Sequence, residues 1–85
     1  MHELRPVPAP RGTLSRWDVW QDGRRLGAIE ERKLSGARLP FYEAYAPHPR
    51  TGKLISLELS THRDERVQVV LRFATHPEEY RQHWS

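Results

Sequence analysis

The sequence predicts a small α+β domain in which an antiparallel sheet of three to five strands is covered on one face by carboxy-terminal helix. A chain of 85 residues has room for one compact domain. Its first two thirds contain runs of alternating apolar and polar residues separated by turn-forming glycine and proline, a pattern typical of strands. Because a single sheet of this size needs a covering layer, the last third is expected to supply it.

Residues 1–14 are expected to form a flexible proline-rich tail before a single folded domain over residues 15–85. Pro6, Pro8 and Pro10 alternate with small apolar residues, which favours extended backbone and prevents a helix. Chain termini are also commonly loose. We therefore place no element of the sheet in this segment.

The first two expected strands form a hairpin. Residues 15–21 alternate, with Trp17 and Val19 on the face that meets the helix. The opposite face of the same strand carries Arg16, Asp18 and Trp20. An Asp-Gly pair then predicts a tight turn into a return strand over residues 25–33. Gly27 within that strand predicts a bulge or the close approach of an aromatic ring.

Two further strands are expected after a Ser-Gly turn. Residues 40–46 contain three aromatic side chains and begin with a proline, which a strand tolerates at its start. Residues 47–52 hold two prolines and a glycine and must form a loop. Residues 53–60 give the clearest alternation, since aliphatic side chains take turns with serine and glutamate.

The carboxy-terminal third fits two patterns over residues 61–74. A helical stripe and a capping box at Thr61 and Asp64 favour a helix. A strand is favoured by the three valines of the segment and by the strict alternation of Val67, Val69, Leu71 and Phe73. We favour the helix, with the strand as the alternative. Residues 76–84 are expected to add a short helix with Tyr80 and Trp84 packed inward.

Several classes of protein are excluded or disfavoured by composition. The chain has no cysteine, which excludes a disulfide scaffold, a thiolate zinc site and a cysteine nucleophile. None of the five histidines forms a ligand pair four residues apart, so neither a metal nor a cofactor is expected. The sequence has no apolar run near the ~20 residues of a membrane span and no signal sequence, so we expect no membrane association and a cytoplasmic location.

Catalytic motifs are also missing, and a non-catalytic function is expected. The sequence lacks a phosphate-binding glycine loop, a GxSxG elbow and an HExxH pair. One enzymatic alternative is a small ribonuclease of the bacterial toxin type. Such an enzyme needs a proton shuttle, which His48 or His62 would supply, and cations for the phosphate, which Arg50 and Arg63 would supply.

The positive charge is concentrated in the middle of the chain. The formal net charge is +3, and residues 24–53 carry seven basic and three acidic residues. A local excess of this kind attracts phosphates or an acidic partner. The expected partner is therefore a nucleic acid, with DNA favoured, and the alternative is an acidic protein.

The predicted sheet presents a face that mixes arginine with aromatic rings. Such a face contacts phosphates and stacks on bases or sugars. We expect Tyr42 or Tyr45 to join it, depending on register. The residues expected to bind nucleic acid are Arg16, Trp20, Arg25, Arg32 and Arg50. In the alternative interpretation the aromatic rings belong to the core and the arginines lie solvated at the rim.

A family resemblance supports the nucleic-acid interpretation. Four segments come in a fixed order before the expected helix: Trp17-x-Val19-x-x-Asp22-Gly23, Leu26-Gly27-x-Ile29, Phe41 to Tyr45, and Leu59-Ser60-Thr61. This order resembles the arm-type DNA-binding domains of tyrosine integrases and plant AP2 domains. The resemblance covers about residues 15–74 and implies a three-stranded sheet that enters the major groove with a helix behind it. It places Arg16, Trp20, Arg25 and Arg32 toward the groove. The long 47–52 loop and the additional strand at 54–60 depart from that pattern.

Protein binding is the main alternative function. Spaced prolines dock in aromatic grooves, a free sheet edge accepts a partner strand, and arginine, tryptophan and tyrosine are enriched at protein interfaces. The sequence thus predicts a small basic nucleic-acid-binding or accessory module that contacts phosphates through a sheet face. A protein-interaction adaptor comes second, and a ribonuclease-type toxin third.

Overall fold

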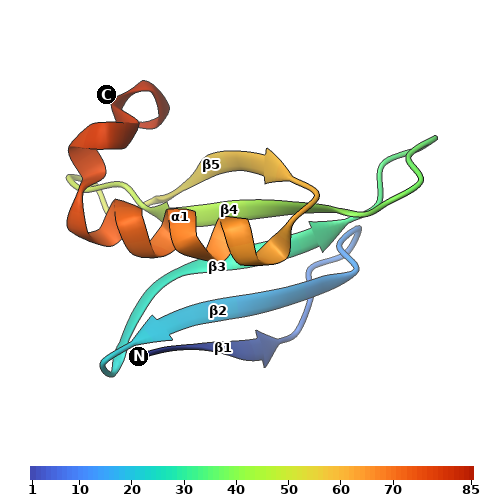
Figure 1. Cartoon of the computed structure of the whole chain (residues 1–85), viewed down its shortest axis with the longest axis horizontal. Helices are drawn as coiled ribbons and strands as arrows, with labels where there is room; N and C mark the ends of the chain where they lie inside the picture. The colour runs from blue at the N-terminus through green and yellow to red at the C-terminus, as the bar shows by residue number, and fades with distance from the viewer.

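The computed structural model describes residues 1–85 and contains five strands followed by two helical segments (Figure 1). In chain order the elements are β1 (His2–Val7), β2 (Ser15–Gln21), β3 (Arg24–Arg32), β4 (Phe41–Pro47), β5 (Leu54–Ser60), α1 (Arg63–Thr75) and the 3₁₀ segment η1 (Pro77–His83). The sheet order is β1-β2-β3-β4-β5, and every neighbouring pair is antiparallel. The predicted α+β fold, an antiparallel sheet with carboxy-terminal helix on one face, is confirmed.

The expected flexible tail over residues 1–14 is corrected by the structure, because its first half forms the edge strand β1. Leu4 pairs with Val19 and packs against the core, which anchors the strand. Pro6 is tolerated because an edge strand has one side on which no backbone N–H is needed. Residues 8–14 then turn back at Gly12, whose φ of 90° is easily reached only without a side chain.

One side of the sheet is covered by α1, which packs on β3, β4 and β5 (Figure 1). The strands turn small and aliphatic side chains toward the helix, and these pack against Val67, Val70 and Phe73 of α1. The buried core consists of Val19, Ile29, Ala44, Ala46, Leu57, Val67, Val70 and Phe73. Alanines on β4 let the helix lie close to the middle of the sheet.

Gly27 marks the closest approach between the layers. A side chain added there would lie 2.9 Å from the Val70 side chain and even closer to the carbonyl oxygen of Tyr45. The expected close approach is therefore present, but it comes from a strand backbone and a valine rather than from an aromatic ring. The expected bulge is also present, since Val19 pairs with Gly27 and Trp20 with Arg25, which leaves Leu26 of β3 as the extra residue beside Gly27.

The ambiguous segment is a helix, so the strand alternative for residues 61–74 is wrong. Burial decides between the two patterns, since Val67, Val70 and Phe73 face the sheet at helical spacing. Buried Arg66 also ties α1 to β5, donating to the carbonyl oxygen of Leu57 at 2.9 Å. The short terminal helix is a 3₁₀ segment with a kink at Tyr80. No helix of the protein is both long and apolar enough to cross a bilayer.

Candidate functional site

The side of the sheet opposite α1, here called the open face, has no helix over it. Across β2 and β3 the register pairs Arg16 with Glu30 and Trp20 with Arg25, so these side chains project together. Tyr45 also lies on this face, whereas Tyr42 packs on the helix side against Trp17 with ring centres 6.4 Å apart. The charged side chains of the open face are Glu3, Arg5, Arg16, Asp18, Arg25, Glu30, Arg32 and Glu43.

A network of ion pairs at the centre of the open face is built on Glu30, whose exposed fraction is only 5%. Its carboxylate accepts from Arg16 at 2.8 Å and from Arg32 at 2.7 Å. Arg32 also forms an ion pair with Glu43 at 2.6 Å and donates a hydrogen bond to the Tyr45 hydroxyl at 2.5 Å. The hydrogen bond that Arg32 donates to Glu30 raises the pKa of the Arg32 guanidinium and so favours its charged form.

The amino-terminal half of the open face is paired in the same way. Arg25 lies 3.4 Å from Asp18, and Arg5 lies 2.8 Å from Glu3. The Arg5 guanidinium also covers the Trp20 ring at 4.1 Å from its centre. Every arginine on the strands of this face thus has a carboxylate partner, and the predicted stacking platform, Trp20, is already occupied by a cation.

Tyr45 gives this network a measurable pH dependence. Burial, together with the hydrogen bond that its hydroxyl donates to Glu43 at 2.6 Å, raises the pKa of the phenol above its ordinary value near 10. The unfolded chain therefore loses this proton first, and the stabilisation, complete below about pH 10, is lost as the pH rises further. Thermal melts in alkaline buffers should show a steeper loss of stability for the wild type than for Tyr45→Phe. Equal slopes for the two proteins would contradict the assignment.

Most of the unpaired cations lie away from this network, whereas Arg11 lies beside it and lines a hollow with Glu30 and Arg32. The basic side chains without a carboxylate partner are Arg11, Arg24, Lys33, Arg38, Arg50, Lys53 and Arg81. Part of this set comes from the connections β1–β2 and β3–β4. The rest comes from the start of β3, the β4–β5 loop and η1, which lie at the opposite end of the sheet (Figure 1). We call this second group, Arg24, Arg50, Lys53 and Arg81, the basic end.

A tryptophan organises the basic end. The guanidinium groups of Arg50 and Arg81 lie 5.7 and 5.9 Å from the centre of the Trp84 ring. His48 holds the tryptophan in place, since its Nε2–H donates to the Trp84 carbonyl oxygen at 2.8 Å and the two rings meet edge to face. Two arginines from distant parts of the sequence thereby contact the same tryptophan ring, and neither side chain donates a hydrogen bond within the protein.

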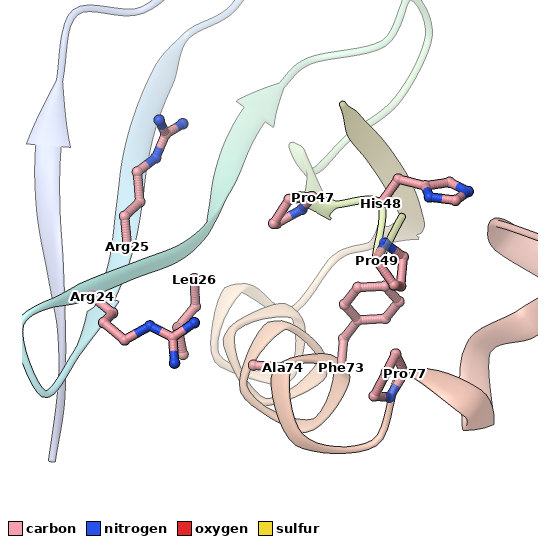
Figure 2. Close-up of a pocket in the computed structure, with 9 residues that line it drawn as sticks. All are labelled: Arg24, Arg25, Leu26, Pro47, His48, Pro49, Phe73, Ala74 and Pro77. Carbon is pink, nitrogen blue, oxygen red and sulfur yellow. The ribbon is translucent and has the colours of Figure 1, made fainter. Parts of the chain in front are cut away.

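A cleft of about 260 Å³ opens beside this cluster, between the start of β3 and the end of α1 (Figure 2). Its apolar lining comes from Leu26, Phe73, Ala74 and three prolines at 47, 49 and 77, and Arg24, Arg25 and His48 complete the walls. Figure 2 shows Arg24 reaching past Leu26 along the mouth, while Arg25 points away and the His48 ring turns outward. The cleft therefore combines an apolar floor with one unpaired guanidinium at its rim.

The geometry gives little support to the ribonuclease alternative. Both ring nitrogens of His48 are engaged, because Nδ1 accepts the backbone N–H of Arg50 at 3.0 Å and Nε2 donates to Trp84. His62 lies beyond the other end of β5, whose seven residues span roughly 20 Å at ~3.3 Å each. The two histidines cannot act on one phosphate.

One group of side chains has the composition of a metal site. The ligand atoms of His76, Glu78 and Glu79 lie within 4.8 Å of one another on the surface. Arg72, however, binds the Glu79 carboxylate through two hydrogen bonds of 3.0 and 2.6 Å, which lowers the pKa of that carboxyl and occupies both of its oxygens. This trio is an arginine-bound cluster rather than an open cation site.

The five residues predicted to bind nucleic acid fall into two places. Arg16, Trp20, Arg25 and Arg32 are brought together on the open face, where each has a partner, and Arg50 lies at the basic end. Sequence reasoning missed three members of that end, Arg24, Lys53 and Arg81. Arg24 and Lys53 lie within the basic stretch 24–53, so the sequence carried a signal for both. Nothing in the sequence indicates the contact between Arg81 and Trp84. No protein-family model, no curated protein and no solved structure matches the chain.

Proposed function

We propose that this protein is a small, non-catalytic nucleic-acid-binding module that contacts the phosphate backbone with its basic end. The observation that carries the proposal is the presence of Arg24, Arg50, Lys53 and Arg81, none of which has a carboxylate partner, at one end of the sheet. Arginine and lysine side chains that lack intramolecular partners release counterions from nucleic acid without first breaking a salt bridge.

The contact surface in this proposal differs from the sheet face expected from the sequence. On the open face a phosphate would have to displace Glu30 from Arg16 and Arg32, and that carboxylate is buried. Moving it aside would leave a buried charge unpaired, at a cost of several kcal/mol. The basic end has no such competitor, so its cations are the better phosphate ligands.

Salt dependence tests this proposal directly. If all four cations contact phosphates, the logarithm of the duplex-binding constant should fall with the logarithm of salt concentration with a slope of about −3.6. Arg24→Gln and Arg50→Gln should each weaken binding and make the slope shallower by about 1. Fluorescence anisotropy of a labelled duplex between about 50 and 200 mM salt measures both quantities.

A matched control separates the basic end from net charge. Arg38 is exposed in the β3–β4 connection at the other end of the sheet and, like Arg24, has no carboxylate partner. Arg38→Gln removes the same charge and should leave the slope unchanged. If Arg38→Gln and Arg24→Gln reduce the slope equally, the attraction is diffuse and the assignment to the basic end is wrong.

A second candidate function, binding of an acidic protein, is favoured by the opposite end of the sheet. There Leu34 and Leu39 are 46% and 62% exposed and lie in the same connection as the unpaired Lys33 and Arg38. Apolar side chains interleaved with cations suit an acidic amphipathic partner. Under this alternative the protein binds no duplex, and its elution in size-exclusion chromatography does not change when DNA is added.

A further inference from the structure

We infer that the cleft beside the basic end receives one unpaired base, so that the protein prefers single-stranded over duplex nucleic acid. This inference rests on the proposed function and adds a substrate class to it. The basic end alone would attract any nucleic acid, because phosphates are common to all of them. A cleft with apolar walls adds a site that only an unstacked base can enter.

The size and lining of the cleft support a single ring system. Its volume of about 260 Å³ lies just below the ~300 Å³ at which pockets for drug-sized ligands begin. The walls formed by Leu26, Phe73 and the three prolines offer flat apolar contact. Because no amide or carboxylate side chain lines the cleft, the site should take any base rather than discriminate among them.

The charges around the cleft determine how a nucleotide would lie in it. The last turn of α1, with Ala74, forms one wall, and the carboxyl end of a helix carries partial negative charge. A phosphate is repelled from that wall and attracted to the Arg24 guanidinium at the opposite rim (Figure 2). The base then points toward Phe73 and the phosphate toward Arg24, from where the strand continues over the basic end.

The test fills the cleft without touching the basic end. Ala74 is exposed and lines the cleft, so Ala74→Trp places a large ring over its mouth without changing charge. The probes are an oligothymidylate and a DNA duplex of the same length, compared by anisotropy. The wild type should bind the oligothymidylate about tenfold more tightly than the duplex, equivalent to ~1.4 kcal/mol. Ala74→Trp should abolish that difference and leave duplex binding unchanged.

The control variant is Gln68→Trp, which adds the same side chain at an exposed position of α1 that does not line the cleft. It should keep the single-strand preference. Equal binding of both probes by the wild type, with the expected salt slope, would overturn the cleft inference and leave the proposed function standing. Loss of preference in Gln68→Trp would also overturn it. Failure of the wild type to bind either probe would overturn both.

Discussion

Gly27→Ala is expected to destabilise the protein by about 3 kcal/mol or more, the largest effect of any methyl-sized change. The added carbon would lie 2.9 Å from the Val70 side chain and even closer to the Tyr45 carbonyl oxygen. That oxygen belongs to the backbone of the adjacent strand, so it cannot rotate away, and β3 must separate from β4 or from α1. Overpacking of a core typically costs 1–3 kcal/mol, and a backbone obstacle raises that cost.

Thermal denaturation measures this effect, and Gly23 supplies a contrast. A loss of about 3 kcal/mol lowers Tm by roughly 15 °C in a domain of this size. Gly23 has a φ of 78° in the β2–β3 turn, but an added carbon would meet no atom within 4 Å. Gly23→Ala should therefore cost only the ~1–2 kcal/mol of the left-handed backbone. Similar Tm values for the two variants would show that the contact between β3 and its neighbours is not the cause.

Glu30→Gln is expected to cost about 2–3 kcal/mol, because one carboxylate neutralises two arginines at the centre of the open face. The Glu30 side chain is only 7% exposed, while Arg16 and Arg32 are 19% and 36% exposed. Removing one partner of a fully buried pair costs about 3–5 kcal/mol. The expected cost is smaller here, since both guanidinium groups reach solvent in part.

An exposed pair on the same face controls for the loss of charge. Glu3 contacts Arg5 at 2.8 Å, as Glu30 contacts Arg16, but the Glu3 side chain is 59% exposed. Water screens such a pair, so Glu3→Gln should leave Tm almost unchanged. Urea denaturation of both variants measures the difference. If Glu30→Gln is as stable as Glu3→Gln, the central network does not stabilise the fold.

Most of the fold could be predicted from the sequence, because alternation and turn residues are local signals. The strand at residues 15–21 and the separation of Trp17 from Trp20 onto opposite faces follow from the two-residue period of a strand. β1 was missed because Pro6 and the two prolines that follow the strand argue against a central strand, and only the tertiary fold makes it an edge. The helix over residues 63–75 was ambiguous because valine spacing fits both periods.

The candidate site was harder to predict, because it depends on which strands are neighbours. Alternation places Glu30 and Arg32 on one face of β3, but Arg16 meets Glu30 only in the observed register of β2 and β3. Carboxylates from other strands therefore neutralise arginines that a count of charged residues in the sequence would take as available for binding phosphate. In the same way, Arg50 and Arg81 are 31 positions apart in the sequence and meet only because Trp84 packs beside the β4–β5 loop.

The meander order of the sheet has a consequence for how quickly the protein folds. Each strand pairs with the strand that precedes or follows it along the chain, so the sheet can assemble hairpin by hairpin over short loops. Sheets whose strands must find distant partners fold in times up to seconds, whereas local pairing shortens the search. Stopped-flow refolding should accordingly finish within milliseconds, leaving little time for unpaired strand edges to meet those of other molecules.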